Sequence, residues 1–186
     1  MLMRILLLTL GLLLAACTAG NAPRYLIDAG ADGDLVRIVP GSVEVRDVSL
    51  PAYASASEIV AQGEDGALYE QGDALWADDP VRGVTGALVR AVGSRTSADI
   101  AAEPWPLADR PDVTIDVRVD DMFAGADGIF ILRGQFALSS PDRVLRETVR
   151  RFDIATPVAG QGTEAITRAQ ASALSRLADE IIASMR

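Results

Sequence analysis

Hydrophobic and polar residues alternate most regularly between residues 112 and 156, and this pattern predicts a meander of three antiparallel strands. Residues 113–119 carry valine or isoleucine at every second position, as expected for a strand with one buried face. Residues 130–138 place large apolar side chains on one face of a second strand. Residues 144–154 predict the third strand, with an irregularity where the apolar residues change face.

Shorter alternating or apolar segments elsewhere predict five more strands. They lie at residues 25–29, 38–48, 57–62, 67–71 and 100–102. The dipeptide Asp65-Gly66 falls between the third and the fourth of these segments, and Asp-Gly is a strong signal for a tight β-hairpin. We therefore expect these two segments to pair antiparallel with each other.

Apolar residues recur at helical spacing in residues 81–92 and 166–181, so each of these segments is expected to bury one stripe of a helix. Asp79 is a suitable N-cap for the first helix, and Pro80 suits its first helical position. Thr163 is expected to cap the second helix in the same way.

This set of elements indicates the α+β class. We expect two layers: a largely antiparallel or mixed β-sheet and two helices packed on one of its faces. Residues 25–186 are expected to form a single domain, because no repeat or low-complexity segment divides them and their number suits one core.

The chain begins with a pattern typical of an exported lipoprotein. Residues 1–16 contain one arginine, an apolar run and a small-residue end, which predicts a signal peptide too short for an ordinary transmembrane helix. The segment Leu14-Ala15-Ala16-Cys17 resembles the bacterial lipobox, which implies a diacylglycerol thioether and a further acyl chain, such as palmitate, at Cys17. Two or more acyl chains give stable anchoring. The alternative is an ordinary signal peptide followed by a chance cysteine.

Residues 17–24 are expected to be the lipidated N-terminus and a short tether. The seven residues after Cys17 span at most about 25 Å, so the domain should stay close to its membrane. By resemblance to bacterial lipoprotein sorting, Thr18 favours the periplasmic face of the outer membrane over the inner membrane.

The composition removes most routes to catalysis. All 17 basic residues are arginine and there is no histidine, which excludes a Ser-His-Asp triad, a P-loop lysine, a Schiff-base lysine and a histidine metal site. We predict no catalytic residue, no metal and no cofactor except the covalent lipid on Cys17. The net charge of −9 argues against nucleic acid as a partner.

Three aromatic residues are candidates for contact with a partner. Trp76 lies just before the first predicted helix, where it is expected to pack over the helix start or, alternatively, to face lipid or a partner. Trp105 lies between two prolines, and core packing and partner contact are both open for it. Tyr53 begins a stretch of small residues and is expected in a loop.

The order and spacing of short motifs resemble the PqiC/YmbA family, the auxiliary lipoproteins of ABC-type and MCE-type transport systems. The shared features are the lipobox, Tyr25-Leu26-Ile27, Leu50-Pro51-Ala52-Tyr53, Ile59-Val60, Leu75-Trp76-Ala77, Gly134-Gln135-Phe136 and an amphipathic C-terminal helix. The resemblance covers nearly all of the chain after the leader. Family members commonly contain lysine, so the all-arginine usage is a departure from their pattern.

The resemblance implies a periplasmic lipoprotein, anchored in the outer membrane, that serves an MCE-domain protein in moving phospholipid between membranes and so supports envelope integrity. It implies a non-catalytic docking subunit in a homo-oligomeric ring. Two alternatives remain open. One is a lipoprotein regulator of a periplasmic cell-wall synthase, although residues 18–24 make a shorter tether than such regulators usually carry. The other is a hydrolase built on paired carboxylates, for which the acidic clusters supply residues but no recognisable arrangement.

Overall fold

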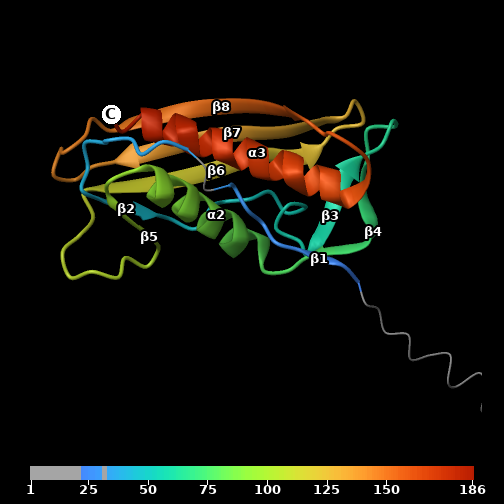
Figure 1. Cartoon of the computed structure of the whole chain (residues 1–186), viewed down its shortest axis with the longest axis horizontal. Helices are drawn as coiled ribbons and strands as arrows, with labels where there is room; N and C mark the ends of the chain where they lie inside the picture. Colours follow the sequence, from blue (N-terminus) through green and yellow to red (C-terminus); the bar gives the residue numbers. More distant parts are fainter. Residues whose placement is uncertain (1–21, 31–32) are drawn as a thin grey trace, which may run out of the picture.

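The computed structural model describes residues 22–30 and 33–186, so the expected signal peptide and Cys17 lie outside the described residues. Within these ranges the chain forms eight strands and two helices (Figure 1). The strands are β1 (Arg24–Tyr25), β2 (Ser42–Val45), β3 (Glu58–Gln62), β4 (Leu68–Trp76), β5 (Asp99–Ala102), β6 (Val113–Ala124), β7 (Ile129–Ser139) and β8 (Thr148–Pro157). The helices are α2 (Pro80–Arg95) and α3 (Gly162–Ala183).

The long strand β6 organises the single mixed sheet. On one side it pairs antiparallel with β7 along its whole length, and β7 pairs antiparallel with β8, which confirms the predicted meander. On its other side β6 pairs with two shorter strands. Its first residues lie parallel to β2, which is followed by β5, and its last residue pairs with β3 of the β3–β4 hairpin. β1 completes the sheet beside β4.

Both helices cover the same face of this sheet, as expected (Figure 1). α3 packs on β7 and β8, whereas α2 packs on β2 and β5 and touches α3. The alternating residues of β6 and β7 that face the helices are almost completely buried, among them Val113, Ile115, Phe130, Phe136 and Leu138. They belong to one hydrophobic core with the buried stripes of the helices. The fold is therefore α+β in two layers, with a mixed sheet.

The local signals around α2 are confirmed. Asp79 is the N-cap, and its Oδ1 accepts a hydrogen bond of 3.0 Å from the backbone N–H of Arg82. Pro80 occupies the first helical position, where its missing N–H costs nothing. The Asp65-Gly66 hairpin is also present, with a φ of 84° at Gly66 that favours glycine.

Several boundary predictions are wrong. The segments 25–29 and 38–48 are strands only at Arg24–Tyr25 and Ser42–Val45, and the strand predicted at 67–71 continues to Trp76. α3 begins at Gly162 with Gln161 as its N-cap, and Thr163 already lies inside the helix, because glycines with positive φ at 160 and 162 make the turn. The third strand of the meander begins at Thr148, not at residue 144. Residues 140–147 form a loop instead, held by hydrogen bonds to the Ser140 side chain and by a left-handed Arg143 with a φ of 56°.

Candidate functional site

Tyr53 fastens a loop to the middle of the sheet. Its phenol oxygen accepts a hydrogen bond of 3.0 Å from the backbone N–H of Met122, and its ring meets Phe123 edge-on with the centroids 6.3 Å apart. This contact lies next to a register irregularity of β6, between Val119 and Asp121. Burial raises the pKa of Tyr53 above its ordinary value of 10.0, and the nearby Asp121 carboxylate adds to that effect against the opposing Met122 hydrogen bond. The side chain is half-buried, so its main observed role is structural.

We expect Tyr53→Phe to lower the free energy of unfolding at neutral pH by about 1–2 kcal/mol, because the Met122 N–H loses its acceptor. The raised pKa of Tyr53 adds a pH dependence. The protonated phenol stabilises the fold fully below pH 10, and this contribution is lost as the pH rises through the raised folded-state pKa. The free energy of unfolding, measured in urea at pH values from 8 to 12, should therefore decline less steeply with pH in the variant than in the wild type. Equal slopes for the two proteins would contradict this role.

The two tryptophans occupy different environments. Trp76 ends β4 with only 5% of its surface exposed, so the structure favours the packing role for this residue. Trp105 is half-buried in the loop between β5 and β6, where its backbone N–H donates to the Glu44 carboxylate at 3.0 Å. Its indole Nε1–H donates to the carbonyl of Asp109 at 2.7 Å, which closes the loop on itself. Partner binding by Tyr53 and Trp105 stays a prediction.

Among the described residues, the face of the sheet away from the helices carries four ion pairs, one of them within β6 and the others between neighbouring segments. Such exposed pairs contribute about 0–1 kcal/mol each, so they act mainly as a hydrated surface. A surface of this kind suits polar contact with protein and water better than contact with acyl chains. The pairs are Arg46–Asp116, Arg118–Asp116, Arg133–Asp121 and Arg133–Asp153, with N–O distances of 3.8, 3.2, 3.9 and 2.9 Å.

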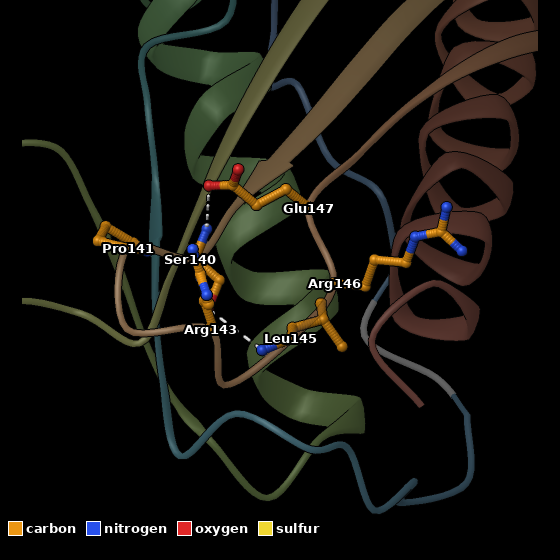
Figure 2. Close-up of a pocket in the computed structure, with 6 residues that line it drawn as sticks. All are labelled: Ser140, Pro141, Arg143, Leu145, Arg146 and Glu147. Carbon is orange, nitrogen blue, oxygen red and sulfur yellow. Dashed lines mark hydrogen bonds between the residues drawn. The ribbon is translucent and has the colours of Figure 1, made fainter.

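The loop between β7 and β8 surrounds an open hollow of about 650 Å³ (Figure 2). Ser140 organises this loop: its N–H donates to the Glu147 carboxylate at 3.1 Å, and its Oγ accepts from the Leu145 N–H at 3.2 Å. The same Oγ donates to the carbonyl of Asp112 and so joins this loop to the start of β6. Figure 2 shows Arg146 directed away from Ser140. Basic side chains therefore line the hollow, and the polar groups of Ser140 and Glu147 form hydrogen bonds within the loop.

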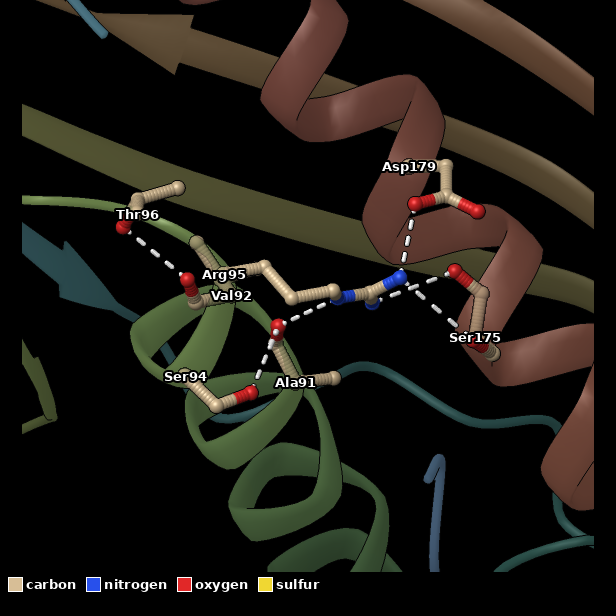
Figure 3. Close-up of polar contacts among 7 residues, drawn as sticks. All are labelled: Ala91, Val92, Ser94, Arg95, Thr96, Ser175 and Asp179. Atoms are coloured by element: carbon tan, nitrogen blue, oxygen red, sulfur yellow. Dashed lines mark hydrogen bonds and ion pairs between the residues drawn. The ribbon is translucent and has the colours of Figure 1, made fainter. Parts of the chain in front are cut away.

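Arg95, the last residue of α2, joins the two helices (Figure 3). Only 5% of its side chain is exposed. Its guanidinium donates to the carbonyl of Ala91 at 2.7 Å, to the carbonyl of Ser175 at 3.3 Å and to the carboxylate of Asp179 at 2.6 Å. These bonds tie the C-terminal end of α2 to residues 175–179 of α3.

The described residues offer no assembled chemical centre. No group of three or more His, Cys, Asp or Glu residues in this part of the chain is placed to hold a metal ion. No helix among residues 22–30 and 33–186 is long and apolar enough to cross a membrane. On the outer face, the carboxylates of Asp116, Asp121 and Asp153 pair with arginine side chains. The arrangement is that of a rigid scaffold with polar surfaces.

Three features of the surface and core do not follow from the sequence analysis. Arg95 was an unremarked base in a helix, and only the folded arrangement of the helices shows that it is buried. The basic stretch 143–151 overlaps the strand predicted at residues 144–154, and its four arginines in nine residues are a signal that the strand pattern does not use. Phe123 was not linked to Tyr53, because their contact depends on where the loop after β2 crosses the sheet.

The fold occurs in solved structures of low sequence identity. One, an uncharacterized protein, has a TM-score of 0.72 and 17% identity, and the match covers 90% of this chain and 100% of that one. Another, a protein of the DUF330 family from Xanthomonas campestris, has a TM-score of 0.60 and 19% identity, with coverage of 87% and 90%. At these identities the likeness shows the fold alone. No curated protein matches this chain.

The sequence matches a family model over residues 26–182, which is most of the chain. The model describes the ABC-type transport auxiliary lipoprotein component. The match begins one residue after β1 and ends inside the last turn of α3, so it includes both helices and the whole meander. The expected resemblance is thereby confirmed, and the protein belongs to the family of ABC-type transport auxiliary lipoprotein components.

Proposed function

We propose that this lipoprotein is a non-catalytic docking subunit of an MCE-type system that moves phospholipid between the two membranes. Its acylated Cys17 holds it on the periplasmic face of the outer membrane, and the folded domain receives the periplasmic end of the MCE-domain protein. The observation that carries this proposal is the family match over residues 26–182, directly after a lipobox and a short tether.

The described surfaces support a protein-binding role. The sheet and helices form a two-layer scaffold with one continuous core, and much of the outer face is covered by ion pairs. Such a face suits contact with a polar protein surface. We also propose that the subunit works as a homo-oligomer, because a ring presents the same docking surface several times around one axis.

The test is crosslinking in intact cells, followed by purification through a C-terminal tag and mass spectrometry. We expect an MCE-domain protein and crosslinked copies of the lipoprotein. The matched variant Cys17→Ala should lose the membrane fraction and at least most of the MCE crosslinks, because its tether has no lipid. Recovery of a cell-wall synthase without an MCE-domain protein would overturn the proposal.

A further inference from the structure

Acidic residues concentrate in one part of the chain. Residues 47–81 contain eight acidic residues and no arginine. Four of the carboxylates lie exposed on the β3–β4 hairpin beside Tyr69, which is itself 52% exposed. We call these residues the acidic surface: Glu64, Asp65, Tyr69, Glu70 and Asp73. The Tyr69 hydroxyl donates to Asp65 and lowers the pKa of that carboxyl, so the charge persists at mildly acidic pH.

Basic residues concentrate in another part. The segment Arg143-Val-Leu-Arg-Glu-Thr-Val-Arg-Arg151 holds four arginines and one glutamate in a protein whose net charge is −9. All four arginines are exposed, and Val149 beside them is 66% exposed. We call these residues the basic surface: Arg143, Arg146, Val149, Arg150 and Arg151. β8 is an edge strand here, because it pairs only with β7.

The two surfaces lie at opposite ends of the domain (Figure 1). The pairing of the strands also places the two surfaces at opposite ends. β3 pairs with the last residue of β6, Ala124, whereas the β7–β8 loop follows Ser139, which pairs with Thr114 at the start of β6. The ten residue-to-residue steps from Thr114 to Ala124 span about 33 Å at the usual strand rise. Opposite charges are therefore separated along the long axis.

Neither surface is neutralised within one copy. Among the ion pairs of the described residues, none involves Arg143, Arg146, Arg150 or Arg151, and none involves a carboxylate of the acidic surface. By contrast, Arg118 and Arg133 of the outer sheet face have carboxylate partners. Each unpaired surface also displays one sizeable apolar side chain, Tyr69 or Val149, which is the composition of a contact with a charged rim.

We propose that neighbouring copies of this chain associate head to tail, with the acidic surface of one copy against the basic surface of the next. This inference rests on the proposed homo-oligomer and assigns the surfaces that build it. The contact is heterologous, since two different surfaces of identical copies meet. Such contacts close into a ring when the rotation from copy to copy returns to the first copy, and otherwise they build an open filament. The opposed charges would set the direction of assembly and exclude head-to-head pairing.

The test uses the full lipidated chain in detergent and follows its oligomeric state by sedimentation. We expect oligomers at 50 mM salt that dissociate as salt rises to 0.5 M, since screening shortens the range of exposed charges to a few ångströms. The variant R143E/R146E and the variant E64R/E70R should each associate on the order of 100-fold more weakly than the wild type. Mixed in equal amounts, these two variants should associate again, because every contact then joins opposite charges.

The matched control is R82E/R90E, which makes the same change in net charge as R143E/R146E but places it on α2. It should keep wild-type association. Circular dichroism identifies any variant that fails to fold, and the salt dependence of the wild type tests the inference without a substitution. Oligomers that resist both salt and charge reversal would overturn these surfaces while leaving the docking proposal intact. A wild type that is monomeric throughout would overturn the inference and the homo-oligomer together, whereas crosslinks to an MCE-domain protein test docking separately.

Discussion

Gly134→Ala is expected to lower the free energy of unfolding by at least about 3 kcal/mol, at the upper end of the cost of overpacking a core. A Cβ atom at this position in β7 would lie 2.1 Å from the carbonyl oxygen of Arg118 and 2.8 Å from the Phe152 ring. The phenyl ring can shift, but the carbonyl belongs to the neighbouring strand β6. The two central strands of the sheet would have to separate to accept one methyl group.

The measurement is equilibrium unfolding in urea, with Gly86→Ala as the matched control. Gly86 lies in α2, where the nearest atom to an added Cβ is the far end of the Arg90 side chain at 3.2 Å. The same chemical change there should stabilise the protein by up to about 1 kcal/mol, because alanine favours the helix. Similar effects at the two positions would show that the close approach at Gly134 does not constrain the sheet.

Gly134 also shows what the sequence can and cannot predict. The tripeptide Gly134-Gln135-Phe136 contributed to the family resemblance, but nothing in it indicated why glycine is required. The reason is a register irregularity in β6 between Val119 and Asp121, which brings the Arg118 carbonyl against β7. An irregularity depends on the pairing of two distant strands. Periodicity within one strand predicts only which face is buried.

The elements that follow from local rules were predicted well. The alternation of residues 113–119, the Asp65-Gly66 hairpin and the Asp79 cap each depend on short-range chemistry, and all three are confirmed. The sheet order could not be obtained in this way. β2 and β3 share one side of β6, and neither is adjacent to it in the sequence.

Some features of the candidate site also follow from the sequence, whereas others depend on the fold. Trp76 was expected to pack near the start of α2, and it is buried. The half-buried state of Trp105 depends on hydrogen bonds to Glu44 and Asp109, which no spacing rule foresees. Charge segregation was visible as composition in residues 47–81 and 143–151, but only the folded chain places these segments at opposite ends. The positions of surface residues therefore depend on the folded arrangement more than the positions of helices and strands do.

Arg95→Met is expected to lower the free energy of unfolding by about 2–4 kcal/mol, because it removes several buried hydrogen bonds at once. Methionine retains much of the apolar stem but has no donor for the Ala91 and Ser175 carbonyls. The end of α2 would lose its tie to α3, and the loop that donates from Val36 to the Arg95 carbonyl at 2.7 Å would loosen with it. Hydrogen exchange should rise in the last turns of both helices.

The variant Asp179→Asn separates the buried hydrogen bonds from the ion pair. Asp179 has 64% of its side chain exposed, so solvent screens its charge, and an amide oxygen can still accept from Arg95. We expect this variant to cost less than about 1 kcal/mol, as for other exposed pairs. Urea unfolding at low and high salt measures both variants. If Asp179→Asn cost as much as Arg95→Met, attraction between the charges would hold the helices together; a much smaller cost would assign that role to the carbonyls that Arg95 binds.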